Sequence, residues 1–294
     1  MASSGRVGFC GLGVMGRQMA SALIEQGFKV HVWNRSSNES LRALQALGAV
    51  VCSSPEAVAR ECPLTFGMVA DPAASRAIAF QGTNSIDKGM RKGAAYVDCS
   101  TVDAQASMET MAAIKAAGGS FLAAPVSGGW RDAKAGKLLF ICGGDEQVYE
   151  QATESMEAMG EKRWLVGSTP DKAAHAKLVL QVMMGNMIGA LGEAMAVADA
   201  AGIDADTVGD MLDASAMGNP LIRAKAKLMS ARDYSPNFQV YLQQKDLHLV
   251  AALSDELQVP TPITSAANNM YVQSMQRGFG NQDFAAVREA YRAP

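Results

Sequence analysis

The sequence has few charged residues, no basic run and few residues that bind metal ions. Only 19% of its 294 residues are charged, and the net charge is −3. Nucleic acid is therefore not an expected partner, because surfaces that bind it concentrate lysine and arginine. No apolar run is expected to reach the length of a membrane span, so no membrane partner is expected. Because only a short segment precedes the first predicted strand, no signal or transit peptide is expected in this sequence.

Cysteine and histidine are too few and too scattered for a metal site. The five cysteines and three histidines show neither C-x-x-C nor the histidine spacing of zinc sites, so no metal is expected. Reduced and mostly buried cysteines are expected, which favours a reducing compartment. We therefore expect a cytoplasmic protein, or an organellar one if a presequence has been removed.

The first 170 residues alternate short apolar runs with amphipathic stretches, a pattern that predicts an α/β domain with a doubly wound parallel sheet. The expected strands lie at 7–11, 29–34, 49–53, 64–70, 94–100, 120–126, 138–144 and 163–167. The expected helices between them include 17–26, 40–47, 104–117 and 146–159.

Around residue 170 the pattern changes to helices alone. Residues 172–201 are apolar on nearly every face, which predicts a long, mostly buried helix between two domains. Further helices are expected at 204–215, 220–231, 242–257 and 261–278, with Asp204 or Asp206, Pro220 and Thr261 as start signals. The predicted domains are 1–170, which binds the nucleotide, and 171–294, an all-α domain for substrate binding and oligomerisation.

The stretch VGFCGLGVMG, residues 7–16, carries the spacing G-x-G-x-x-G directly after the first predicted strand. In a dinucleotide-binding βαβ unit the three glycines allow a tight turn, close approach of a pyrophosphate and close helix–strand packing. By itself the motif is also compatible with an ordinary turn. The residues predicted to hold the pyrophosphate are Gly11, Leu12, Gly13, Val14, Met15 and Gly16.

The end of the second predicted strand indicates which dinucleotide binds. NAD-binding proteins place an acidic residue there for the ribose 2′-hydroxyl, but this sequence has Asn34, Arg35 and Ser36. A guanidinium can pair with a 2′-phosphate, and the two polar neighbours can donate to it, which favours NADP. A solvated loop arginine is the alternative interpretation.

Two further loops follow apolar runs, where a substrate is expected. DCST, residues 98–101, places Thr101 at a strand's carboxyl end. In PVSGGW, Ser127 offers a hydroxyl, and Gly128 and Gly129 are expected to leave their backbone N–H groups open to a carboxylate. Each loop alone could be an ordinary turn, but together with the glycine motif they indicate one site.

Lys177, near the start of the long apolar helix, is the candidate proton donor for reduction of a carbonyl. Its apolar neighbours would desolvate the amine and lower its pKa. Gln181 lies one turn further on the same face and could bind the substrate. A surface lysine whose amine reaches solvent is the alternative.

In this order and at these separations, GLGVMG, DCST, PVSGG, the Lys177 helix and QQKDLHL resemble the β-hydroxyacid dehydrogenases over nearly the whole chain. NRS, STVD and residues 216–256 are most similar to the plant-type glyoxylate and succinic semialdehyde reductases. The resemblance implies NADP(H), a Rossmann-type domain followed by a long interdomain helix and an all-α domain, and a homodimer or homotetramer.

The resemblance also implies roles for individual residues. Met68 and Val69 would line the cofactor cleft, and Thr101 would lie beside the nicotinamide. Ser127 and Gly128 would hold the substrate carboxylate while Lys177 acts as general acid. Phe238 would cap the pocket, Lys245 would touch the cofactor, and Asp246 would pair near Lys177.

The sequence departs from the family pattern at three places. The family usually has asparagine where this chain has Gln181, and commonly an acidic residue where it has Ala123; Trp130 follows PVSGG. Reduction of glyoxylate to glycolate, or of succinic semialdehyde to 4-hydroxybutyrate, is the expected activity. The alternatives are oxidation of a 3-hydroxyacid such as 3-hydroxyisobutyrate, imine reduction, and a non-catalytic NADP-binding scaffold.

Overall fold

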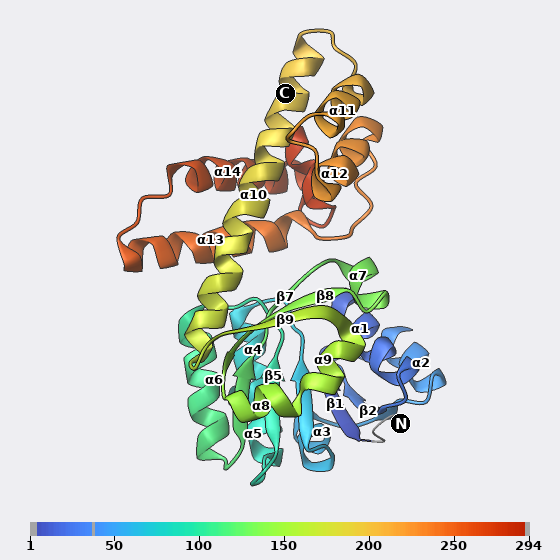
Figure 1. Cartoon of the computed structure of the whole chain (residues 1–294), viewed down its shortest axis with the longest axis vertical. Helices are drawn as coiled ribbons and strands as arrows, with labels where there is room; N and C mark the ends of the chain where they lie inside the picture. Colours follow the sequence, from blue (N-terminus) through green and yellow to red (C-terminus); the bar gives the residue numbers. More distant parts are fainter. Residues whose placement is uncertain (1–4, 37–38, 292–294) are drawn as a thin grey trace. The chain divides into compact units, whose positions relative to one another are not determined.

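The computed structural model describes residues 5–36 and 39–291. The chain divides between Lys177 and Leu178 into two compact units, called the N-terminal and C-terminal units below (Figure 1). The dividing point lies within one continuous helix, so the same helix contributes its first turns to one unit and the remainder to the other.

Nine strands of the described residues form one sheet in the N-terminal unit. They are β1 (Arg6–Cys10), β2 (Lys29–Trp33), β3 (Val50–Val51), β4 (Leu64–Gly67), β5 (Ala95–Asp98), β6 (Ser120–Ala123), β7 (Val126–Ser127), β8 (Leu138–Gly144) and β9 (Gly160–Gly167). Six strands run parallel in the order β3-β2-β1-β4-β5-β6. This is the strand order of the dinucleotide-binding Rossmann fold, so the predicted fold class is confirmed.

Both faces of the central strands β1, β4 and β5 are buried, which explains why these strands are mostly apolar rather than alternating. Neighbouring residues of a strand point to opposite faces. Phe9 packs into one hydrophobic cluster and Cys10 into another. Val97 and Tyr96 divide between the same two clusters. A parallel sheet covered by helices on both sides requires this composition.

The structure differs from the prediction at the far edge of the sheet. β8 runs antiparallel to β6 and β7, and β9 runs parallel to β8. The two-residue β7 is not among the predicted strands. An apolar run has the same composition in either direction, and two residues are too few for a periodic signal, so neither feature is visible in the sequence.

The helices of the N-terminal unit agree with the prediction where they are long. They are α1 (Val14–Glu25), α2 (Glu39–Ala46), α3 (Pro55–Glu61), α4 (Pro72–Arg76), η1 (Ala77–Gln81), α5 (Ile86–Gly89), α6 (Ala104–Ala116), α7 (Trp130–Lys134), α8 (Glu146–Gln151) and α9 (Thr153–Met159). The predicted helix at 146–159 is two helices that meet at Ala152. The short α3, α4, α5 and α7 were not predicted, because fewer than about eight residues give little helical periodicity.

The C-terminal unit is helical, as predicted. The helices are α10 (Pro170–Ala200), α11 (Ala205–Ala214), α12 (Pro220–Ala231), α13 (Val240–Leu257), α14 (Pro262–Ser274), η2 (Met275–Phe279) and η3 (Phe284–Tyr291). The three predicted start signals are confirmed: the Asp204 side chain caps α11, α12 begins at Pro220, and Thr261 is the N-cap residue of α14. The cap hydrogen bonds of α12 come from the Asn219 side chain, and the Thr261 side chain makes no cap bond within the described residues.

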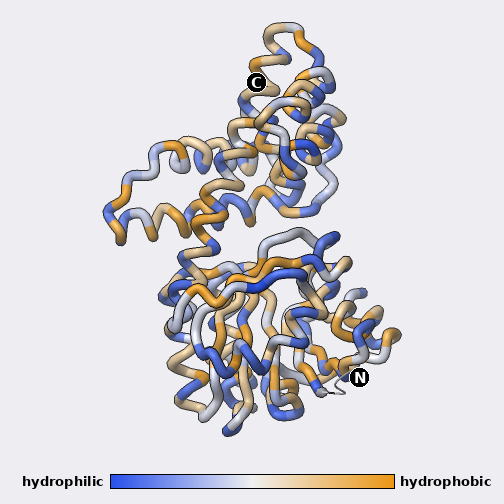
Figure 2. The backbone as a smooth tube through the Cα atoms, viewed as in Figure 1, coloured by the Kyte–Doolittle hydropathy of each residue, from blue (hydrophilic) through white to orange (hydrophobic). Residues whose placement is uncertain are grey.

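Helix α10 corrects one expectation. By length and composition alone it could cross a membrane, although no such run was expected. Figure 2 shows the hydrophobic residues that run along it. The core helix of a globular domain meets the same test, and side chains such as Ile188 and Met195 are buried in the hydrophobic core of the C-terminal unit.

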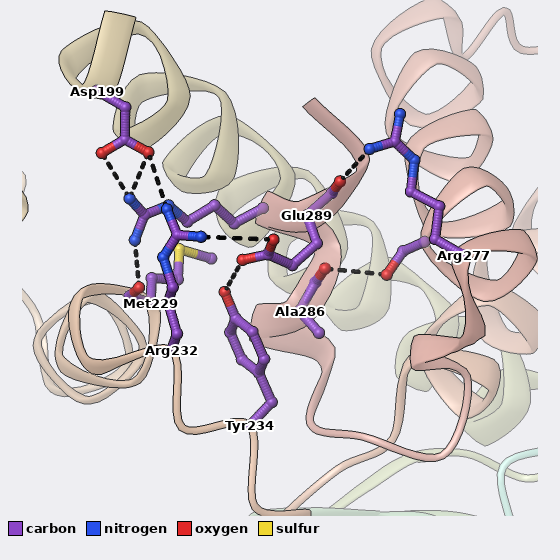
Figure 3. Close-up of polar contacts among 9 residues, drawn as sticks. Asp199, Met229, Arg232, Tyr234, Arg277, Ala286 and Glu289 are labelled. Carbon is purple, nitrogen blue, oxygen red and sulfur yellow. Dashed lines mark hydrogen bonds and ion pairs between the residues drawn. The ribbon is translucent and has the colours of Figure 1, made fainter. Parts of the chain in front are cut away.

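A network of hydrogen bonds and ion pairs in the C-terminal unit surrounds η3 (Figure 3). The buried Arg288 guanidinium donates to both carboxylate oxygens of Asp199, at 2.6 and 2.7 Å, and to the Met229 carbonyl. The Tyr234 hydroxyl donates to Glu289 at 2.6 Å, and burial together with this carboxylate raises the pKa of Tyr234. The network joins η3 to α10 and to the end of α12.

Candidate active site

The glycine turn after β1 has the geometry that the motif predicts. Gly11 has φ +92°, and its N–H donates to the Trp33 carbonyl at 3.0 Å. Gly13 is the N-cap residue of α1, and a methyl group there would have no atom of the described residues within 4 Å apart from its chain neighbours. A methyl group on Gly16 would overlap the Gly11 carbonyl oxygen. The turn, the open approach and the close packing therefore belong to three different glycines.

The remaining residues of the turn orient it. Leu12 is fully buried, and its N–H donates to the Asn34 side-chain oxygen at 2.9 Å. Met15 packs against the core of the N-terminal unit, whereas Val14 is exposed. Because Gly13 has no side chain to cap α1, the first-turn amides of α1 are suited to an anion.

Asn34 links the glycine turn to the loop after β2. Its Oδ1 accepts from Leu12, and its Nδ2 donates to the Ser36 carbonyl at 3.0 Å. The sequence did not indicate this positioning contact. Arg35 and Ser36 are exposed at the end of β2, and residues 37 and 38, next in the loop, lie outside the described residues.

Hydrogen bonds join the segment after β4 both to the end of β1, directly before the glycine turn, and to the segment after β5. The Met68 N–H donates to the Cys10 carbonyl at 3.0 Å, and the Val69 N–H donates to the Ser100 hydroxyl oxygen at 2.9 Å. Met68 and Val69 also pack against Gly11, where a side chain would overlap the Met68 carbonyl. The half-buried Thr101 follows Ser100 directly.

Buried Asp98 holds this loop. One carboxylate oxygen accepts from the Ser100 N–H at 2.9 Å and the other from the Ser75 hydroxyl at 2.6 Å. Burial raises the pKa of Asp98, and the hydrogen bonds from the two serines oppose that shift. Ser75 was missed, because nothing in the sequence connects α4 with β5.

The second predicted loop needs one correction. Gly128 has φ +121°, in the left-handed region, so glycine is required there. The Gly129 N–H donates to the Asp132 carboxylate at 2.7 Å and is therefore not open, contrary to the expectation. The donors left for a substrate carboxylate are Ser127 and the Gly128 backbone. Trp130 begins α7 at this point, with the Arg131 guanidinium 4.6 Å from its ring centroid.

Two polar residues of α10 are buried. Lys177 is 5% exposed and Gln181, one turn later, is 2% exposed, so the lysine is not a surface residue. The Gln181 amide donates to Asp246 on α13. Asp246 is also buried, and its other carboxylate oxygen lies 2.6 Å from the Lys245 ammonium. The sequence did not predict either contact of Asp246.

Phe238 lies two residues before α13 and is half-buried. Its ring packs edge-on against Phe284, with 5.5 Å between the ring centroids. Among residues 5–36 and 39–291, no group of three or more histidine, cysteine or acidic side chains could hold a metal ion. The five cysteines are unpaired, and four of them are buried.

Comparison with known proteins assigns both parts of the chain. Residues 6–192 match the family model for the NAD-binding domain of 6-phosphogluconate dehydrogenase. Residues 172–291 match the model described as NAD-binding of NADP-dependent 3-hydroxyisobutyrate dehydrogenase. The chain belongs to the β-hydroxyacid dehydrogenase family. The predicted family and the predicted nicotinamide dinucleotide cofactor are thereby confirmed.

Individual relatives agree with this assignment. Glyoxylate/succinic semialdehyde reductase 1 of Arabidopsis thaliana is 37% identical over 97% of this chain and 98% of its own length. The chloroplastic reductase 2 of the same plant is 37% identical over 98% of this chain and 79% of its own length. A crystal structure of 3-hydroxyisobutyrate dehydrogenase from Salmonella typhimurium superposes with a TM-score of 0.90, at 28% identity, over 97% of this chain and 99% of that one.

Gly13 and Gly16 should respond differently to substitution by alanine. Gly13→Ala should fold normally, because its methyl group meets no protein atom, but should weaken NADPH binding by about tenfold or more. Gly16→Ala should lower the free energy of unfolding by about 1–3 kcal/mol, because the Gly11 carbonyl must move. Thermal unfolding and NADPH titration measure the two effects, and equal destabilisation by both substitutions would contradict this division of roles.

Proposed function

We propose that this family member is an NADPH-dependent reductase of short aldehyde acids, which converts glyoxylate to glycolate and succinic semialdehyde to 4-hydroxybutyrate. The observation that carries the proposal is the burial of Lys177, one turn from a glutamine that is bonded to a buried carboxylate. The names of the two Arabidopsis relatives support the substrate class.

Lys177 supplies the proton in this proposal. When bound, NADPH provides the hydride that reduces the carbonyl carbon. The Lys177 ammonium donates a proton to the carbonyl oxygen as negative charge develops there, and the resulting neutral amine recovers a proton from solvent. A buried ammonium is a stronger donor than a solvated one, because desolvation disfavours its charged form.

The other residues bind and orient. Ser127 and Gly128 donate to the substrate carboxylate, and Thr101 lies beside the nicotinamide. The Gln181–Asp246 hydrogen bond directs the amide NH₂ of Gln181 toward the Asp246 carboxylate. Phe238 forms an apolar wall of the substrate pocket. Lys245 contacts the cofactor, and its ammonium neutralises the negative charge of Asp246. The glycine turn and the first amides of α1 hold the pyrophosphate. We assign cofactor binding to residues 1–170, and substrate binding and oligomerisation to 171–294.

A homo-oligomer is part of the proposal. Val179, Met183 and Val197 of α10 are 61%, 59% and 64% exposed. Val179 and Met183, four residues apart, lie on one face of the helix. Exposed apolar side chains of this kind favour a protein interface, which fits a homodimer or homotetramer.

The closest alternative is oxidation of a 3-hydroxyacid such as 3-hydroxyisobutyrate. It is favoured by the TM-score of 0.90 with a dehydrogenase of that name. Gln181 and Ala123 bear on the choice, because both depart from the family pattern at positions associated with the substrate.

A substrate panel tests the function. Glyoxylate, succinic semialdehyde and 3-hydroxyisobutyrate should be compared with NADP(H) and NAD(H) by following nicotinamide absorbance. We expect the highest kcat/KM for one of the two aldehyde acids with NADPH. If both are inert and 3-hydroxyisobutyrate is oxidised, the alternative is correct. If no compound reacts but NADPH binds, the scaffold interpretation stands.

Lys177→Met should lower kcat by about a hundredfold or more, because a positioned general acid contributes about 10²–10⁴ to the rate. NADPH binding should stay nearly unchanged. Lys172→Met is the matched control: it removes an exposed ammonium from the same helix and should leave kcat within about twofold. Steady-state kinetics and NADPH titration distinguish these outcomes, and full activity of Lys177→Met would remove this residue from the mechanism.

Arg35→Ala should weaken NADPH binding by about tenfold or more while changing NADH binding little, because only NADPH carries the 2′-phosphate. Arg42→Ala, on the exposed face of α2, is the control for a general loss of positive charge. Titration of each variant with both nucleotides checks the prediction. Equal losses for NADPH and NADH would assign Arg35 to the adenine rather than to the phosphate.

A further inference from the structure

A buried ion pair lies between α12 and the start of η3. The Lys225 ammonium is 2.8 Å from both carboxylate oxygens of Asp283, and the two side chains are 4% and 0% exposed. Burial of two charges has a large desolvation penalty, and an apolar pair of similar volume is often at least as stable. Stability is therefore a weak explanation for this pair.

The carboxylate does more than neutralise the lysine. One oxygen of Asp283 accepts the backbone N–H groups of Asn237 and Phe238, each at 3.2 Å. The other accepts the N–H of Ala285 at 3.0 Å. One buried anion thus binds the backbone of two segments that are about 45 residues apart in the sequence.

Backbone bonds reinforce the same junction. The Asp283 N–H donates to the Tyr234 carbonyl at 2.9 Å, and the Phe284 N–H donates to the Phe238 carbonyl at 2.7 Å. Both the N–H and the carbonyl of Phe238 are therefore bound to residues 283 and 284. The backbone of Phe238 has little freedom to shift.

Phe284 and Lys225, which belong to the same junction, also hold the ring of Phe238. It packs edge-on against Phe284, and the Lys225 ammonium lies 4.5 Å from the centroid of the Phe284 ring. The cation attracts the face of that ring. Lys225 and Asp283 consequently act on both the backbone and the side chain of the Phe238 region.

The junction also defines where α13 begins. Val240, its first residue, donates its N–H to the Gln282 carbonyl at 2.9 Å. Asp246, which binds Gln181, lies on the same helix less than two turns later. A displacement of residues 237–239 would therefore be transmitted to the start of the helix that carries Asp246.

We propose that Lys225 and Asp283 are positioning residues for the substrate pocket, which set the place of Phe238 and the register of the first turns of α13. The proposal rests on the proposed function through the assigned role of Phe238. It differs from a purely structural role because loss of the anion should change the affinity for substrate more than the affinity for cofactor.

Two variants of the Lys225–Asp283 ion pair distinguish a positioning role from a purely structural one. Asp283→Asn removes the anion that receives the Asn237 and Phe238 amides and should raise KM for the aldehyde acid about tenfold, with kcat and NADPH affinity within about threefold. Lys225→Met leaves those amides on the carboxylate and should raise KM less. In a Phe238→Ala background, Asp283→Asn should raise KM no further, because the two substitutions act on one element.

Asp199→Asn is the matched control, since it breaks the ion pair of the buried Arg288 in the same unit without touching residues 237 and 238 (Figure 3). It should lower the melting temperature and leave KM unchanged. If Asp283→Asn and Asp199→Asn affect KM equally, the proposal is wrong. If Asp283→Asn does not fold, Phe284→Leu replaces it, because this change loosens Phe238 without altering a charge; an unchanged KM would then overturn the proposal.

Amide hydrogen exchange distinguishes failure of this proposal from failure of the proposed function. If the wild-type protein reduces no aldehyde acid, the proposed function is wrong. Exchange at Asn237, Phe238 and Val240 still decides the positioning claim: faster exchange in Asp283→Asn than in Asp199→Asn supports it, and equal exchange overturns it.

Discussion

The N-terminal unit depends on the contact between Gly16 of α1 and the carbonyl oxygen of Gly11. No side chain fits between them, so helix and strand can approach only with glycine at that position. This approach fixes where α1 begins and where its first amides point. The hydrogen bonds from Leu12 to Asn34 and from Met68 to Cys10 then tie the segments after β2 and β4 to this turn, and the bond from Val69 to Ser100 ties the segment after β5 to the one after β4. The end of the sheet that we assign to the cofactor is thus pre-organised by backbone geometry.

The C-terminal unit is organised by a different constraint, the need of buried charges for partners. Asp246, Asp283 and Arg288 are each almost fully buried, and each has a charged partner and at least one further hydrogen bond. Such groups tolerate few arrangements, because a displaced charge would lose its partner in a medium that cannot solvate it. These groups constrain the arrangement of α10, α12, α13 and η3 more strictly than the methionine-rich packing around them, because methionine side chains adapt to different surroundings.

These two constraints match the chemistry of the family. A dinucleotide needs open backbone donors at the end of a parallel sheet, which glycine and a helix N-terminus provide. Under the proposed function Lys177 is the proton donor, and it is buried on a helix whose next turn is hydrogen-bonded to Asp246 through Gln181. The Asp132 carboxylate accepts the Gly129 N–H, so of the three donors expected for a substrate carboxylate only the Ser127 hydroxyl and the Gly128 N–H enter the proposed site.

The sequence by itself determined the fold class, the glycine turn, the strand ends with Thr101 and Ser127, and the lysine helix. These are local signals, carried by a fixed spacing or by periodicity along one element. Only the tertiary structure decided that Ser75 binds Asp98, that Gln181 binds Asp246 and that Asp283 holds Phe238. Those partners are separated by 23, 65 and 45 residues, and no spacing rule connects them, because a long-range contact follows from how whole elements pack and not from the residues that lie between.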